Sequence, residues 1–209
     1  MKRLLVTALL GAAALVLSQP AAGQTVRGGI KGGLSLADIP VLTESFKDEG
    51  AVDLRYRYGV IVGGFATIRL ADWVAFQPEA LYTQKGMHGR DPSGADDVFE
   101  ARVDYVDVPM LIRLQPSSGR GVYAVAGPSV NFNIAAKLVD EGDNDETDIK
   151  DDIESVEVGL VVGVGLQLSK FLVEGRYAEG LTNIAKDPDP EEDSYRNRSF
   201  AIMVGVRFP

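Results

Sequence analysis

Residues 156–168, VEVGLVVGVGLQL, alternate between two kinds of side chain along their whole length. Every second residue from Val156 to Leu168 is valine or leucine, and most of the residues between them are glycine or polar. Because successive side chains of a β-strand point to opposite faces of a sheet, this period of two predicts a strand with one apolar face. A strand of a soluble sandwich would show the same alternation, so this segment alone does not say what covers the apolar face.

Seven further stretches repeat the alternation, which gives eight predicted strands in a chain of 209 residues. They cover residues 26–36, 58–70, 74–83, 106–114, 122–134, 171–177 and 199–208. A single all-β domain fits this length. After the first 23 residues no stretch approaches the roughly 18 apolar residues that a membrane helix needs, so a place in a membrane would require a closed barrel.

The polar faces of these strands indicate that the apolar faces point outward into lipid. A solvated outer face does not need many glycines, whereas a narrow lumen needs small neighbours that leave room for arginine and glutamate side chains. Apolar residues outside and charges inside is the arrangement of outer-membrane barrels. The glycines on the polar face are Gly29, Gly33, Gly63, Gly127, Gly159, Gly163, Gly165 and Gly205.

The connections between the predicted strands alternate between short and long. Short turns are expected near 71–72, 116–120 and 169–170, and long polar loops over 37–55, 86–100, 137–153 and 182–195. Transmembrane barrels typically have short turns on the periplasmic side and long loops on the extracellular side, and compact soluble domains rarely carry four such loops at one end. The sequence therefore predicts an all-β, eight-stranded antiparallel transmembrane β-barrel with short periplasmic turns and four long extracellular loops.

The N-terminus is typical of a cleaved secretory signal. Lys2 and Arg3 precede an apolar run over 4–17, and small residues stand at the expected cleavage site. We expect a signal peptide at 1–23 and a barrel domain at 24–209, located in the outer membrane of a Gram-negative bacterium. Loss of Lys2 and Arg3 changes the formal charge from −9 to −11 (−9 minus 2), which argues against nucleic acid as a partner.

Four segments resemble a known family. They are GGIKGGLS at 28–35, FQPEALYTQKG at 76–86, YVDVPMLIR at 105–113, and 123–129 with its Gly127-Pro128 pair. In this order they resemble the PorT-like outer membrane protein beta-barrel domain family, small porin-family barrels of the Bacteroidota type. The resemblance covers essentially the whole mature chain and implies the fold and the outer membrane, but it brings no catalytic residues. Such barrels usually end on an aromatic residue, and here Pro209 follows Phe208.

Outward-facing aromatic residues are expected in two bands, one at each membrane interface. The band nearer the long loops consists of Tyr58, Tyr82, Phe132, Tyr177 and Phe200. The band nearer the short turns consists of Phe76, Phe171 and Phe208. Together they form the predicted aromatic girdle.

The inward positions carry charges of both signs. Eight strands leave an interior that side chains can just fill, and an unpaired charge there would carry a desolvation penalty of several kcal/mol. We therefore expect ion pairs across the lumen, with the glycines making room, so that the lumen is filled. The predicted charge network consists of Lys31, Arg69, Glu79, Asp107, Arg113, Glu157, Glu174, Arg176 and Arg207, and Arg27 has the same parity.

No residue pattern predicts an active site, a cofactor or a metal site. His88, the only histidine, is expected in a long loop, with no serine or cysteine nucleophile identifiable as its partner. The acidic segment 140–152 has enough carboxylates to hold Ca²⁺ or Mg²⁺ but lacks the EF-hand spacing. A solvated acidic loop that is dispensable for folding is the simpler interpretation of this segment and of a second one at 187–193.

The function expected from these features is that of a non-enzymatic structural or surface-interaction protein with a side-chain-filled lumen. The main alternative is a narrow porin for small solutes. Further alternatives are a membrane enzyme with a site at the loop rim and a soluble, lipocalin-like binder in the periplasm. Expected partners are outer-membrane lipid, lipopolysaccharide and, through the C-terminal strand, the barrel assembly machinery.

Overall fold

The computed structural model describes residues 25–38, 53–90, 97–140, 145–148, 150, 154–182 and 196–208. The signal peptide expected at 1–23 and the acidic segment at 187–193 lie outside the described residues. In the part of the chain that the structure describes, no helix is long and apolar enough to cross a membrane. The described elements are β1 (Val26–Asp38), β2 (Asp53–Arg69), β3 (Val74–Arg90), β4 (Asp97–Leu114), β5 (Gly121–Asp140), β6 (Asp145–Asp148), β7 (Val156–Leu168), β8 (Phe171–Gly180) and β9 (Arg198–Arg207).

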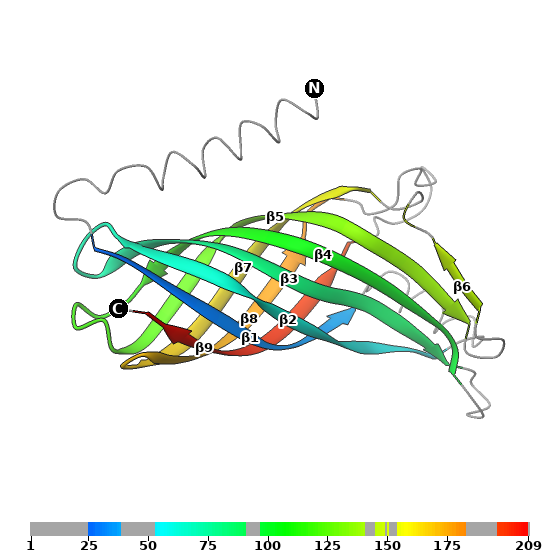
Figure 1. Ribbon diagram of the computed structural model, residues 1–209, viewed down its shortest axis with the longest axis horizontal. Coiled ribbons are helices and arrows are strands. Elements are labelled where there is room, and N and C mark those ends of the chain that lie inside the picture. The colour runs from blue at the N-terminus through cyan, green and yellow to red at the C-terminus, as the bar shows by residue number, and fades with distance from the viewer. Residues whose placement is uncertain are drawn as a thin grey trace, which may run out of the picture.

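Eight of these strands close into an antiparallel barrel, as the sequence predicted. Their order around the barrel is β4-β3-β2-β1-β9-β8-β7-β5, and an additional pairing of β4 with β5 closes the ring. The first and last strands meet where β1 pairs with β9, from Gly29 opposite Arg207 to Asp38 opposite Arg198. Closure leaves the barrel strands without a free edge, so their backbone groups are satisfied within the sheet. Figure 1 shows the strands tilted around a common axis.

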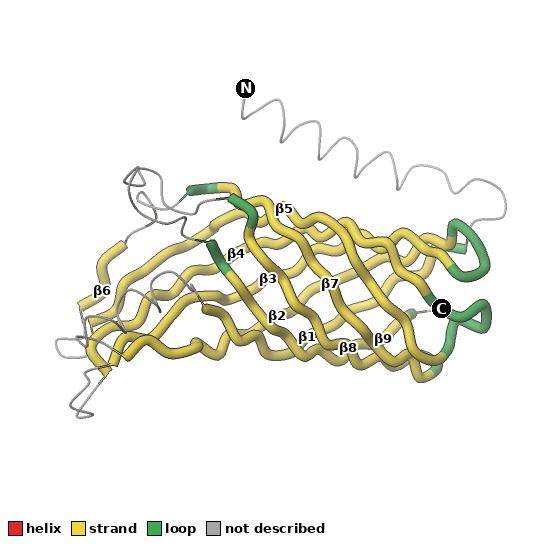
Figure 2. The backbone as a smooth tube through the Cα atoms, turned by 180° about the vertical axis from the view of Figure 1, so that it is seen from behind, coloured by secondary structure: helices red, strands yellow, loops and turns green. Residues whose placement is uncertain are grey.

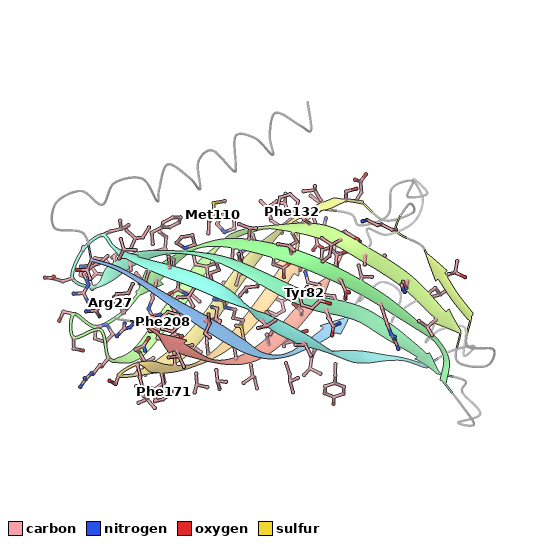
Figure 3. The ribbon with its side chains drawn as sticks, in the orientation of Figure 1. Arg27, Tyr82, Met110, Phe132, Phe171 and Phe208 are labelled. Carbon is pink, nitrogen blue, oxygen red and sulfur yellow. The ribbon has the colours of Figure 1, made fainter. Side chains whose placement is uncertain are left out.

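The two faces of the barrel have the polarity that the alternation predicted. On β7 the side chain of Val162 points outward and is 43% exposed, whereas that of neighbouring Val161 points inward and is 4% exposed. On β9 Ile202 is 70% exposed and Met203 is fully buried. Figure 3 shows apolar side chains such as those of Phe132 and Phe171 projecting from the outside of the barrel.

Three short turns lie together at one end of the barrel, beside the C-terminus (Figures 1 and 2). They span 70–73, 115–120 and 169–170 and agree with the predicted short connections. Two residues in these turns adopt left-handed backbone conformations, Ser169 with φ 57° and Gly119 with φ 66°. We call this end the turn end and the opposite end, where β6 lies, the loop end.

The strands extend further toward the loop end than the sequence predicted. Strand β3 continues to Arg90, so His88, which was expected in a loop, lies in a strand opposite Glu100 of β4. The acidic segment also contains a strand, because β6 pairs with the end of β5 from Lys137 to Asp140. The prediction failed there because such an extension no longer alternates regularly between apolar and polar residues. Backbone pairing then persists without the apolar alternation that reveals a strand.

Candidate functional site

The centre of the lumen holds four charged side chains in one network. Lys31 of β1 places its Nζ 2.8 Å from Glu79 Oε1 and 3.2 Å from Glu174 Oε1. Arg176 of β8 donates from Nη1 and Nη2 to the two oxygens of Glu79 on β3, at 2.7 Å each, and from Nε to Glu174. All four side chains are at most 5% exposed. Strands β3 and β8 lie on opposite sides of the ring, so the network, which we call the central network, spans the lumen.

Arg113 of β4 lies next to the central network on the turn side and is bound by neutral groups. Its guanidinium donates to the side-chain oxygens of Gln115, Gln77 and Gln167 at 2.9, 3.0 and 3.1 Å. It also stacks 3.5 Å from the centroid of the Tyr123 ring. Such stacking and planar hydrogen bonding suit a guanidinium that is removed from water, and Arg113 is only 1% exposed.

Tyr123 connects Arg113 to the central network, and a glycine makes this possible. Its hydroxyl donates to Glu174 Oε2 at 2.8 Å. A Cβ atom at Gly165 on β7 would overlap the Tyr123 ring, so only glycine leaves space for it there. Gly29 leaves space for the Phe65 ring in the same way, and Phe65 lies beneath Lys31 with 5.4 Å between Nζ and the ring centroid.

Apolar side chains separate the central network from the loop-end half of the lumen. One buried cluster consists of Ile61, Leu81 and Met203. A second consists of Leu111, Tyr123, Val125 and Val161, and it adjoins the central network itself through the Tyr123 hydroxyl. Leu81 follows Glu79 on β3 in the direction of the loop end, and Leu111 separates Arg113 from Asp107 on β4. The lumen is therefore layered, with an ionic centre and an apolar layer above it.

The loop-end half of the lumen contains a second, looser polar group. Lys85 Nζ lies 3.7 Å from Asp107 Oδ1 and 4.5 Å from the centroid of the Tyr105 ring. Asn197 donates from Nδ2 to Glu157 Oε2 at 2.8 Å and to the Tyr105 hydroxyl at 3.3 Å. These contacts join residues of β3, β4, β7 and the segment before β9.

A small pocket adjoins this second polar group. Its volume is about 10 Å³, about the space that one water molecule needs, and its polar lining includes Lys85, Ser129, Asn131, Glu157, Asn197 and Ser199. Nearby buried atoms have no hydrogen-bond partner within the described residues, namely Thr83 Oγ1, Asp107 Oδ1 and both amide atoms of Asn133. Buried polar atoms without a partner are typical sites for bound water, so this half of the lumen is polar and has room for about one water molecule in the pocket.

The structure divides the nine charged residues predicted for the lumen into separate groups. Lys31, Glu79, Glu174 and Arg176 form the central network, while Arg113 binds glutamines and not carboxylates. Asp107 and Glu157 belong to the loop-end half, and Arg69 and Arg207 have no ion pair within the described residues. A single network of all nine residues is therefore not formed.

Sequence reasoning missed Lys85 and the neutral partners Gln77, Tyr123 and Gln167. Lys85 was overlooked because the predicted strand ended at residue 83, although its parity continues to the inward side. The neutral residues were overlooked because only charged side chains were considered, whereas buried guanidinium and carboxylate groups also need uncharged hydrogen-bond partners. Extending the alternation along the full length of each strand, and counting uncharged polar and tyrosine side chains at the inward positions, would have identified these four residues.

The aromatic residues predicted for the girdle are found on the outer face of the strands, and Figure 3 places Phe171 and Phe208 near the turn end. Tyr177 and Phe200 pair across β8 and β9 near the loop end, with ring centroids 4.9 Å apart. Their assignment to two membrane interfaces remains a prediction.

The described residues offer little for chemistry. In the described ranges, no three His, Cys, Asp or Glu side chains lie close enough together to hold a metal ion. The lysine, arginine and tyrosine side chains of the lumen donate hydrogen bonds to carboxylate and amide oxygens, and these bonds hold the side chains of the lumen in place.

Comparisons with known proteins agree with this architecture. Residues 18–186 match the family described as outer membrane protein beta-barrel domain. Among solved structures, Neisserial surface protein A is similar in fold. The alignment covers 89% of this chain and 99% of that protein's chain, with 12% sequence identity and a TM-score of 0.51. Ail, the attachment invasion locus protein of Yersinia pestis, covers 90% and 100%, with 10% identity and a TM-score of 0.45. OprG of Pseudomonas aeruginosa covers 88% and 97%, with 12% identity and a TM-score of 0.43. No curated protein gives a significant match.

Proposed function

The chain belongs to the outer membrane protein beta-barrel domain family, and from this premise we propose that it is a closed, non-conducting barrel of the outer membrane that acts through its loop end. In this proposal the protein is not an enzyme, its outer face contacts lipid, and the loop end interacts with molecules at the cell surface. The more specific likeness to PorT-like barrels of the Bacteroidota type belongs to the same proposal.

The observation that carries the proposal is the central network. Arg176 holds both oxygens of Glu79 from the opposite wall, and Lys31 joins both carboxylates. Opening a path through the lumen would separate ions that are almost fully buried, and breaking such pairs costs several kcal/mol. The buried cluster of Ile61, Leu81 and Met203 adds a second obstacle to a hydrated ion, because its side chains offer no polar groups.

Planar bilayer recording tests whether the barrel conducts. We expect the purified folded monomer to show no stable ohmic conductance in 1 M KCl, about the salt concentration at which even narrow pores are detected, while a known porin in the same bilayer conducts. Steady single-channel steps that scale with the number of inserted barrels would contradict the proposal.

A narrow porin is the second candidate, and the polar pocket beside Lys85 favours it. The pocket and the unpartnered atoms of Thr83 and Asn133 provide polar groups in the loop-end half of the lumen that a path for small solutes could use. In that case Glu79→Ala should open a conductance without changing the free energy of unfolding. A closed structural barrel predicts the reverse, a large loss of stability without conductance.

The orientation of the barrel is part of the proposal. We place the loop end outside the cell and the turn end in the periplasm, with the aromatic residues near the two interfaces and with β9 presented to the barrel assembly machinery during insertion. Lys150, exposed at the loop end, provides a trypsin site. Trypsin added to intact cells should cleave there and leave the barrel strands whole. Cleavage only after rupture of the outer membrane would reverse the orientation.

A further inference from the structure

The turn end of the lumen carries arginines that the central network does not use. Arg27, Arg69 and Arg207 have inward parity near the ends of β1, β2 and β9, three strands that are neighbours in the ring. Arg120 lies in the turn between β4 and β5 and is exposed. Figure 3 shows Arg27 at this end of the barrel. We call these four residues the arginine mouth.

Two of these guanidinium groups, from different strands, converge on the turn between β4 and β5. The turn connects β4 and β5; Arg207 reaches it from β9, across the ring from β4, and Arg69 reaches it from β2, which is separated from β4 by β3. A Cβ atom on Gly119 in this turn would lie 3.4 Å from Arg69 Nη2 and 4.0 Å from Arg207 Nη1. Arg207 Nη2 also donates to the backbone carbonyl of Ser169, at 3.3 Å in the neighbouring turn. The arginines thus frame the opening of the lumen and are held over it by the turns.

Within the described residues, none of the four arginines forms an ion pair. Asp72 is the only acidic residue in the three turns, and it also has no ion pair there. The next cation inward, Arg113, is bound by glutamine side chains. Among the described residues, positive charge therefore accumulates from Arg113 to the opening without an ion pair, whereas Arg176, deeper in the lumen, pairs with two carboxylates.

Convergent guanidinium groups without carboxylates suit a particular class of ligand. Guanidinium presents N–H donors in a planar fork that matches two oxygens of a phosphate group, and arginine is the usual residue for such bidentate recognition. Two guanidinium groups close to one glycine repel each other, and a bound anion would replace that repulsion with attraction. Partial exposure of Arg27, Arg69 and Arg207 leaves their donors accessible from the opening.

We propose that the arginine mouth is a binding site for a phosphate-bearing anion, either a free phosphate compound or the headgroup of a phospholipid. Arg69 and Arg207 bind the phosphate oxygens, and Arg27 and Arg120 add charge at the edge of the site. This site is independent of the loop-end function proposed above and of whether the barrel conducts.

Isothermal titration calorimetry on the full mature chain, folded in an uncharged detergent, tests the proposal with two probes at constant ionic strength. Sodium pyrophosphate represents the free compound, and dihexanoyl phosphatidic acid below its micelle concentration represents the headgroup. We expect the wild type to bind at least one of them, and the double variant R69Q/R207Q to bind it roughly tenfold or more weakly. Binding of pyrophosphate alone assigns a free ligand, and binding of the lipid alone assigns a headgroup.

The matched control removes two arginines from the other end of the barrel. Arg196 and Arg198 are exposed near the loop end, so R196Q/R198Q changes the net charge equally and should leave the affinity unchanged. If R69Q/R207Q does not fold, the exposed Arg120→Gln variant replaces it, with an expected loss of about threefold. The proposal is overturned if the wild type binds neither probe, if both double variants lose affinity equally, or if Arg120→Gln, used as the replacement, binds as the wild type does.

Discussion

The centre of the lumen and its turn end both contain arginine, but the arginine in the centre has carboxylate partners and those at the turn end have none among the described residues. Arg176 in the centre is 7% exposed and bonds to two carboxylates, whereas Arg69 and Arg207 at the opening are partly exposed and have none. Desolvation makes an unpaired buried charge costly, while water at the opening screens a charge that has no partner. Depth in the lumen therefore decides whether this chain must supply polar partners for an arginine, which are carboxylates for Arg176 and glutamine oxygens for the likewise buried Arg113.

Removal of a carboxylate from the central network should have the largest effect. Glu79→Gln leaves Lys31 and Arg176 with Glu174 as their only carboxylate, and breaking a buried ionic group in this way typically lowers the free energy of unfolding by about 3–5 kcal/mol. Urea titration of the barrel in lipid vesicles measures the loss. Glu179→Gln is the matched control, because Glu179 is 41% exposed and 3.9 Å from Arg198, and it should change stability by about 1 kcal/mol or less. Equal losses would mean that burial does not distinguish the two pairs.

Arginine on the opposite face of the sheet extends the comparison to lipid. Val162 points outward in the middle of β7, and Val162→Arg should lower the free energy of unfolding by about 2–4 kcal/mol if it lies at the membrane midplane. Val156 also points outward but lies at the loop end of the same strand, where arginine should cost about 1 kcal/mol or less. The same vesicle titration applies to both variants. If Val156→Arg were the more harmful change, the assumed depth of β7 in the membrane would be wrong.

Crowding in the centre should appear as a smaller effect. A methyl group at Gly165 would push against the Tyr123 ring, which is tied to Glu174 and stacked on Arg113. Gly165→Ala should therefore lower the free energy of unfolding by about 1–3 kcal/mol, the usual range for overpacking. Gly175 has nothing within 4 Å of its Cβ position, so Gly175→Ala is the control and should be close to neutral. If Gly165 were not needed to make room for the Tyr123 ring, the two substitutions would lower the free energy of unfolding by the same small amount.

The arginine mouth should contribute least to stability. Arg69→Gln removes a charge that has no ion pair within the described residues and lies near other cations, so the free energy of unfolding should change by about 0.5 kcal/mol or less in the absence of phosphate compounds. The measurement is the same titration at low and high salt. A loss as large as that of Glu79→Gln would show that Arg69 has a structural partner and that the contrast between the two regions is false.

The extent of the strands shows where sequence reasoning succeeded and where it stopped. Within the apolar band, alternation identified all eight barrel strands and put Val162 outside and Val161 inside, as the structure has them. Beyond that band it failed, because the loop-end extensions no longer alternate regularly between apolar and polar residues, as in β6 (DETD) and in residues 84–90 of β3 (QKGMHGR). His88 in β3 and the acidic strand β6 were therefore expected in loops.

The alternation of residues is enough to predict which way each side chain of the barrel points, because the pleat of a strand gives a local period of two. It therefore identified Lys31, Glu79, Glu174 and Arg176 as inward charges. The alternation does not show that these four side chains form ion pairs with one another, or that Arg69 and Arg207 lie apart from them at the opening. Both facts are visible in the three-dimensional structure alone. Glu79 and Arg176 are 97 residues apart in the chain, and their contact depends on the order, register and closure of eight strands. Turn geometry sets the register of each hairpin, but closure depends on the tilt and stagger of all eight strands together, which no local pattern encodes.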